Sequence, residues 1–265
     1  MCYHVRRVAE YGEFLSRRTQ GMKEEVVRKQ VLSLVALLAI VMGLLVSGCG
    51  EVSHEAHTET QRVELGSAES ARVEIHMGAG TLAIGGGAQD LLEAAFTYSQ
   101  ESWKPEVEYA VSGSEGVLTI RQPSVKGVIP SPELRYEWGL RFNSDVPMEM
   151  NIEMGVGGGE LALGDLNLRK LDLEVGVGGA NISLDGDWQA DLDASISGGV
   201  GGLKITLPRD VGVRVEAKSG LGGVDAEGFH KEGDVYTNDA YGSSDATLDL
   251  KIEVGVGGVE LILAQ

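Results

Sequence analysis

The sequence has little of several things that disulfide-rich, metal-binding or nucleic-acid-binding proteins need. Only two of its 265 residues are cysteine, so neither a disulfide framework nor a four-ligand zinc site can form. Basic residues are scarce, 22 against 40 acidic ones, and the formal charge of −18 argues against nucleic acid or an anionic membrane face as a partner. Glycine is abundant at 38 residues, but without a three-residue period, which excludes collagen.

The longest uncharged apolar run, Val31–Val46, is short for a membrane-spanning helix. Its 16 residues would span about 24 Å as a helix, against the ~30 Å hydrocarbon core of a bilayer. Lysines and arginines precede the run and small residues follow it, which is the layout of a secretory signal peptide. We therefore expect residues 1–48 to be a signal peptide, with Met22 as the more ordinary start. The alternative is an uncleaved signal anchor.

The run ends in Val46-Ser47-Gly48-Cys49, which resembles the lipobox of bacterial lipoproteins. The resemblance implies that the Cys49 thiol carries a diacylglycerol, with palmitate-type acyl chains, and becomes the mature N-terminus. Such an anchor would hold the chain on the extracytoplasmic face of a bacterial cell membrane, since two or more acyl chains bind a bilayer stably. Residues 49–66 are polar and are predicted to be a tether. His54 and His57, two histidines in this tether, form no recognised metal motif.

A glycine motif, Gly-x-Gly-Gly, recurs five times after residue 148. The first glycines of successive copies are 21, 23, 21 and 35 residues apart, and such a period is typical of a solenoid. The last gap contains an insertion, Gly228–Asp245. Fifteen glycines are thus expected to be structural: Gly155, Gly157, Gly158, Gly176, Gly178, Gly179, Gly199, Gly201, Gly202, Gly220, Gly222, Gly223, Gly255, Gly257 and Gly258.

Apolar residues alternate with polar ones on both sides of each motif, but the parity slips by one across it. Leu171, Leu173 and Val175, for example, precede the motif, and Ala180 and Ile182 follow it. A straight strand would then turn its second half inside out, so the chain must bend at the glycines. We predict an all-β fold, a parallel β-solenoid with strand–glycine arc–strand rungs of about 21 residues over 148–265. Each arc would lie over the previous one, where a Cβ would collide with the next rung. The alternative is an antiparallel sandwich.

Residues 67–147 differ in composition from the glycine repeats and are predicted to be an N-terminal β unit that caps the solenoid. They begin with a degenerate copy of the repeat around Gly80. Alternation predicts strands at Leu92–Tyr98, Val107–Ser112, Val117–Arg121 and Leu134–Phe142. Seven aromatic residues are concentrated here, and we interpret them as core: Phe96, Tyr98, Trp103, Tyr109, Tyr136, Trp138 and Phe142.

This part of the chain resembles a known family. Arg72–Gln122, which contains GAGTLAIGGGAQDLLEAAFTYSQ, resembles the toast-rack N-terminal domain of bacterial envelope proteins. Met148–Leu263 is similar to the LiaF-like and adhesin-like β-solenoid domains associated with it. The resemblance implies a surface or periplasmic module for adhesion or envelope-stress sensing, and it transfers no catalytic residue.

A search for chemistry finds no motif in a suitable context. Gly78-Ala-Gly80-Thr-Leu-Ala83 matches a dinucleotide pattern, but a strand is expected where a phosphate-binding helix should begin. Asp185–Asp193 resembles a calcium loop, but the required Gly and Glu are replaced. A looser Ca²⁺ site on an acidic face stays open. The sequence predicts no catalytic residue, no cofactor and no enzyme.

Two functions remain, and a third is weaker. The first is a lipid-anchored module that binds or senses an envelope protein or glycan. The second is a structural protein that associates with itself, and the third is an enzyme acting on polysaccharide through paired carboxylates. The sequence ends two residues after Leu263, so the last rung, Thr247–Leu263, is expected to expose a strand edge. The insertion, or a strand from another chain, would cover that edge.

Overall fold

The structure, a computed structural model, describes residues 56–124 and 135–265. The expected signal peptide, Cys49 and His54 lie outside these residues. The described residues belong to one compact unit with a common core, which includes both sides of the expected boundary between 147 and 148.

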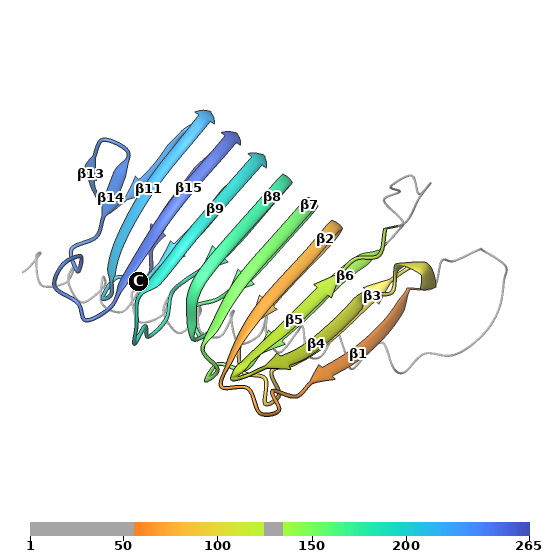
Figure 1. Cartoon of the computed structure of the whole chain (residues 1–265). Helices are drawn as coiled ribbons and strands as arrows, with labels where there is room; N and C mark the ends of the chain where they lie inside the picture. The colour runs from red at the N-terminus through yellow and green to blue at the C-terminus, as the bar shows by residue number, and fades with distance from the viewer. Residues whose placement is uncertain (1–55, 125–134) are drawn as a thin grey trace, which may run out of the picture. The chain divides into compact units, whose positions relative to one another are not determined.

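The predicted all-β solenoid is confirmed, and six rungs stack side by side in parallel (Figure 1). Three rungs are single long strands that bend at the glycines: β2 (Ser70–Gly85), β7 (Met148–Ala162) and β8 (Leu168–Ser183). Three are strand pairs interrupted at the arc: β9 (Leu192–Val200) with β10 (Leu203–Leu207), β11 (Gly212–Leu221) with β12 (Val224–Glu227), and β15 (Thr247–Val256) with β16 (Val259–Leu263).

The bend divides the structure into two sheets with the core between them. Sheet 1 contains the halves before the arcs, in the order β4-β5-β2-β7-β8-β9-β15-β11-β14-β13, and sheet 2 contains the halves after them, in the order β1-β3-β6-β2-β7-β8-β10-β16-β12. The parity slip has the predicted effect. In β8, Leu171 and Leu173 before the arc and Ala180 and Ile182 after it are all at most 3% exposed.

The order of the last two rungs differs from the prediction. The β15–β16 rung lies between β9–β10 and β11–β12, not at the end of the stack. Leu248, Leu250 and Ile252 in β15 are fully buried, whereas β11 has the smaller Val213, Val215 and Ala217 at matching positions. Placing the more apolar copy between two neighbours buries more apolar surface, and the long insertion gives the chain room to cross over.

The insertion covers the end of the stack, but over a different rung. Its hairpin, β13 (His230–Glu232) and β14 (Val235–Thr237), pairs antiparallel with β11. Asn238, 3% exposed, accepts a hydrogen bond from the Val213 N–H and donates to the Val211 carbonyl. The expectation that Thr247–Leu263 exposes an edge is therefore wrong, since that rung is internal.

The N-terminal strands lie close to their predicted positions. They are β3 (Leu92–Tyr98), β4 (Glu106–Ser112), β5 (Glu115–Arg121) and β6 (Tyr136–Phe142), with a 3-10 turn at Glu101–Trp103. Six of the seven aromatic residues are buried, which confirms them as core, and Tyr109 is partly buried. Phe96 packs edge-on against Trp138 at 5.6 Å, and burial raises the pKa of Tyr136.

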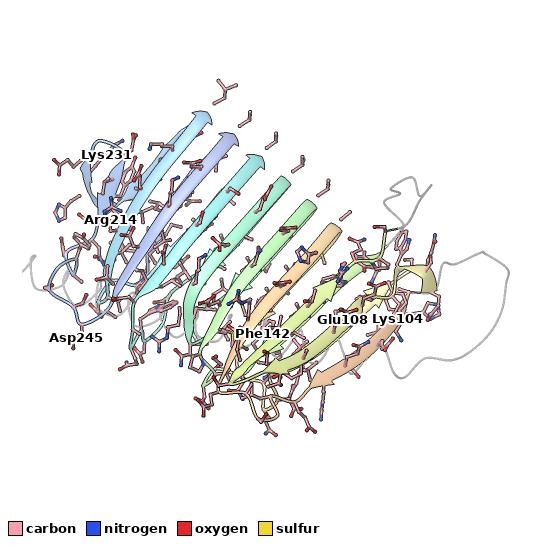
Figure 2. The ribbon with its side chains drawn as sticks, viewed as in Figure 1. Lys104, Glu108, Phe142, Arg214, Lys231 and Asp245 are labelled. Atoms are coloured by element: carbon pink, nitrogen blue, oxygen red, sulfur yellow. The ribbon has the colours of Figure 1, made fainter. Side chains whose placement is uncertain are left out.

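The tether prediction is wrong for part of its range, because His57–Val63 form strand β1, which pairs antiparallel with β3. The segment is polar because it is an edge strand at the end of the sheet. Glu59 pairs with Lys104 at 2.8 Å and accepts a hydrogen bond from the Tyr98 hydroxyl. His57 lies against the Tyr98 ring, with centroids 6.0 Å apart. Lys104 lies at this end of the molecule (Figure 2).

Candidate functional site

The second glycine of each motif is required by the backbone. These glycines, which we call the second-glycine row, have φ between +136° and +149°. At all of them except Gly80, a Cβ would overlap the carbonyl oxygen of the equivalent glycine in the adjacent rung. An L-residue is strained at such a φ, and the contact adds a steric conflict. The row comprises Gly80, Gly157, Gly178, Gly201, Gly257 and Gly222.

The first glycine of each motif is required by crowding alone. At each position a Cβ would lie too close to a backbone oxygen of the adjacent rung, although none of these residues has a positive φ. Gly176, for example, faces the carbonyl of Gly155. This first-glycine row comprises Gly155, Gly176, Gly199, Gly255 and Gly220.

The third glycine of each motif has no such requirement. A Cβ at Gly158, Gly202 or Gly258 would have its nearest neighbour at 3.8–3.9 Å, and at Gly223 it would meet nothing within 4 Å. Only Gly179 is tighter, with the Gly202 oxygen at 3.0 Å. The explanation that a Cβ would collide is therefore wrong for most of this third-glycine row.

Five large apolar side chains stand exposed on the arcs, between the first and second glycines. They are aligned in register across the rungs, so they form a continuous line that we call the arc ridge. Their exposed fractions are 56% at Val156, 50% at Val177, 51% at Val200, 43% at Val256 and 70% at Leu221.

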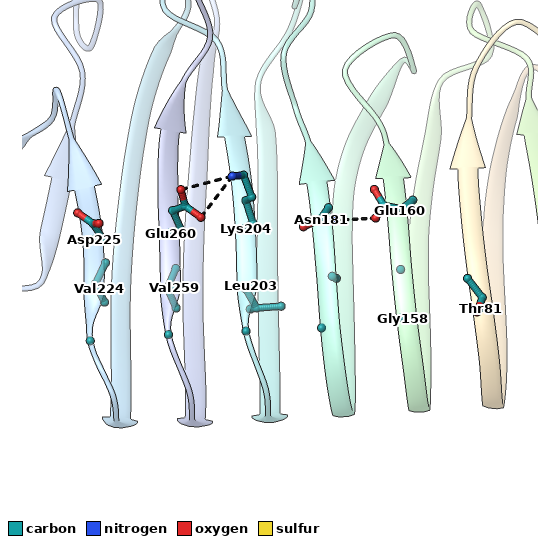
Figure 3. Close-up of a pocket in the computed structure, with 16 residues that line it drawn as sticks. Thr81, Gly158, Glu160, Asn181, Leu203, Lys204, Val224, Asp225, Val259 and Glu260 are labelled. Carbon is teal, nitrogen blue, oxygen red and sulfur yellow. Dashed lines mark hydrogen bonds and ion pairs between the residues drawn. The ribbon is translucent and has the colours of Figure 1, made fainter. Parts of the chain in front are cut away.

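A groove of about 900 Å³ runs across all six rungs on the sheet 2 side of the arcs (Figure 3). The third-glycine row forms part of its lining, with Thr81 in the equivalent position of β2. Polar side chains follow two positions after the third glycine. Asn181 donates a 2.6 Å hydrogen bond to Glu160, and Lys204 lies 3.4 Å from Glu260. Asp225 ends this polar line on β12.

The outer face of sheet 1 is different, because charged residues cover it. One register row reads Arg72, Glu149, Lys170, Asp193, Asp249 and Arg214. Arg214, labelled in Figure 2, pairs with Asp249 at 2.9 Å. Nearby, the hydrogen bond from Lys218 raises the lysine pKa and lowers the pKa of Glu216. Such mutually neutralised surface pairs keep the face soluble and contribute little to stability.

The remaining candidates from the sequence have ordinary surroundings. His76 lies 2.9 Å from Glu153 on the sheet 1 face. Gly78 to Ala83 belong to strand β2, so they cannot open a phosphate-binding helix. In the turn after β8, Asp191 accepts a hydrogen bond from the Thr247 N–H. Within residues 56–124 and 135–265, no group of His, Cys, Asp and Glu is arranged to hold a metal ion.

The same described part of the chain has no helix with the length and apolar character to cross a bilayer. The candidate site is the surface of the arcs, where the exposed ridge and the groove lie next to each other. They can bind a partner through apolar contact on one side and hydrogen bonds or charge on the other.

Comparison with known proteins gives the class of this molecule. Residues 52–206 match the model of the N-terminal domain of toast_rack, and the chain belongs to this family. A putative cell adhesion protein from Clostridium sporogenes is 33% identical, with a TM-score of 0.75 over 79% of this chain and 100% of that one. The match includes the rungs as well as the N-terminal strands, because the family model extends past β7 and β8.

A putative adhesin from Bacteroides fragilis is a more distant neighbour, 13% identical with a TM-score of 0.34, covering 78% of this chain and 97% of that one. No curated protein matches the chain.

Proposed function

We propose that the protein is a non-catalytic, adhesin-like binding module of the bacterial cell envelope, which contacts an envelope protein or glycan through the arc ridge and the arc groove. The observation that carries the proposal is the third-glycine row. These glycines line a groove although most of them have room for a side chain. Glycine weakens a strand and often marks a place where a ligand or another backbone approaches closely.

The arc ridge supports the same surface. Large aliphatic side chains bury little apolar area when half of each is exposed, so folding gains less from them than from core residues. Scattered exposed valines need no explanation, but a contiguous apolar line is typical of an interaction site. The similarity to a putative cell adhesion protein favours binding over catalysis.

Adhesion of the purified full chain to isolated envelopes tests this surface. Val200→Asp would place a charge on the ridge, and Ser195→Asp would place the same charge on the sheet 1 face of the same strand, β9. We expect the first change to reduce adhesion at least about tenfold and the second to leave it nearly unchanged. Equal adhesion by both variants would exclude the arcs. A monomer-to-dimer shift that Val200→Asp abolishes would instead support the self-associating alternative.

The proposal includes a lipid anchor at Cys49, on the extracytoplasmic face of the membrane. It rests on the lipobox-like Val46–Cys49 and on the uncharged run before it. Cys49→Ser should leave an unprocessed precursor that takes up no labelled palmitate. If this variant incorporates the label and migrates like the unmodified sequence, the lipoprotein reading is wrong, whatever the result at the arcs.

A further inference from the structure

The last rung of the stack is covered on one half only. Sheet 1 continues beyond β11 with β14 and β13, whereas sheet 2 ends at β12, which pairs with β16 alone. We propose that the free edge of β12, Val224–Glu227, binds an extended basic peptide segment of a partner protein by strand addition. The site lies outside the arc ridge, although Val224 and Asp225 also line the end of the arc groove.

The backbone of β12 presents hydrogen-bonding groups away from the sheet. The Val259 N–H donates to the Gly223 carbonyl, so the N–H of Val224, in the same peptide unit, points to the opposite side. In a regular strand the N–H and C=O of Val224 and Ala226 then face outward together. Among the described residues, no donor or acceptor pairs with them. An added strand would find these four groups aligned for a ladder.

The side chains of β12 indicate that a neighbouring strand is missing. Val224 and Ala226 occupy the inward positions filled by Val259 and Leu261 in the adjacent rung, which are each 1% exposed. On β12 both are only partly buried, and Phe229, which follows the strand, is partly buried as well. The core is therefore open at this point, and a peptide with apolar side chains at alternate positions would cover it.

The opposite edge of sheet 2 is built differently. Strand β1 turns Glu59 and Gln61 toward the side that is apolar elsewhere in the sheet, and Lys104 pairs with Glu59. Inward-pointing charge on an edge strand discourages further strand addition. In β12 the inward positions are Val and Ala, and the strand has no Lys, Pro or bulge to block pairing. Of the two ends of sheet 2 in the described residues, the β12 end is therefore the one suited to accept another strand.

Charge selects a basic segment. Asp225 and Glu227 are the outward-facing residues of β12, and Glu260 lies beside Asp225 on the next strand. Lysine or arginine at the outward positions of an added strand would lie opposite these carboxylates, and cross-strand pairs of opposite charge are stabilising.

A second copy of this chain is a poor occupant. Antiparallel pairing of two β12 strands would set Asp225 against Glu227, and like charges directly opposite each other are destabilising. The β13–β14 hairpin also extends sheet 1 by two strands into the space where the sheet 1 of that copy would lie. A single extended peptide segment fits beside the hairpin, whereas a whole second copy with its two sheets does not.

Fluorescence anisotropy with the full chain in detergent tests the proposal. The probes are two labelled peptides, one alternating Lys and Val and one alternating Glu and Val. We expect saturable binding of the Lys peptide, weakened by salt, and at least about tenfold weaker binding of the Glu peptide. No binding of either peptide, or equal binding of both, would overturn the inference.

Ala226→Pro removes the outward N–H without removing a bond to β16, and proline is tolerated on an edge strand. It should weaken the Lys peptide at least about tenfold with an unchanged melting temperature. Asp225→Lys should weaken it as well, and Glu137→Lys, at an exposed position of β6 toward the other end of sheet 2, is the matched charge control. Unchanged binding to Ala226→Pro would exclude strand addition at β12.

A dimer that Ala226→Pro abolishes would show that a second copy is the occupant instead. Adhesion at the arcs should be unaffected by this variant, so the two proposals fail separately.

Discussion

The second-glycine row and the third-glycine row lie one residue apart in the same motif, yet they are glycines for different reasons. At Gly178 the backbone has a φ of +136°, and a Cβ would overlap the carbonyl of Gly157. At Gly158 the nearest atom to a Cβ is 3.9 Å away, and no positive φ is involved. The fold requires glycine at Gly178, whereas glycine at Gly158 leaves the backbone exposed along a groove. A repeated residue therefore does not imply a repeated cause.

The largest expected effect is that of Gly178→Val. The substitution combines backbone strain, about 1–3 kcal/mol, with overpacking against the adjacent rung, about 1–3 kcal/mol more. We expect a loss of about 2–6 kcal/mol in the free energy of unfolding, measured by denaturant titration. The same substitution at the turn residue Gly233 cannot serve as the control, because its φ of +63° would strain any L-residue there. If Gly178→Val unfolds like the unmodified sequence, the difference between the two rows does not exist.

Gly176→Ala separates crowding from strain. Gly176 has no positive φ, but a Cβ there would lie against the carbonyl of Gly155. The rungs must then move apart locally, and we expect a loss of about 1–3 kcal/mol. A loss as large as that of Gly178→Val would mean that crowding alone explains the arc and that the positive φ contributes nothing.

The arcs were more predictable from the sequence than the order of the rungs. The parity slip between Val175 and Ala180 can be read directly, because only a bend keeps both apolar sets in one core. The position of β15 depends on which of two copies buries more apolar surface between neighbours, and that is a comparison of whole rungs. The β1 strand was missed because it is an edge strand that is polar on both faces, and such a strand has the composition of a tether.

The groove was not predictable either, because it too depends on how neighbouring rungs are placed. All three glycines of a motif look alike in sequence, and crowding was the natural explanation for each. Only the distances to backbone oxygens of the adjacent rung separate a packed glycine, such as Gly179, from one with room for a side chain, such as Gly202. The apolar residue between the glycines could have given a signal. Val156 and Val177 fit the alternation of a core strand, but they fall on the outside of the bend.

Val177→Thr tests whether the arc ridge belongs to the fold. Val177 is 50% exposed, so replacing a methyl by a hydroxyl should cost about 0.5 kcal/mol or less. Val175→Thr, two residues earlier at a position that is 2% exposed, is the matched control. It should cost well over twice as much, since its hydroxyl would be buried without a hydrogen-bond partner. Equal losses in the free energy of unfolding would show that the ridge stabilises the fold as the core does, and would remove the argument that it is a binding surface.

The smallest expected effect is that of Gly158→Thr, and it is the sharpest test of the comparison. The neighbouring rung already carries a threonine at this position, because Thr81 pairs in register with Gly158. A β-branched residue therefore fits the backbone, and its β-propensity offsets any minor loss. We expect a change within about 0.5 kcal/mol in the free energy of unfolding, together with a clear loss of adhesion to envelopes as the side chain fills the groove. A large destabilisation would show that the fold requires the third glycine after all. A stable variant that still adheres would show that the bare backbone of the groove is not where the partner binds.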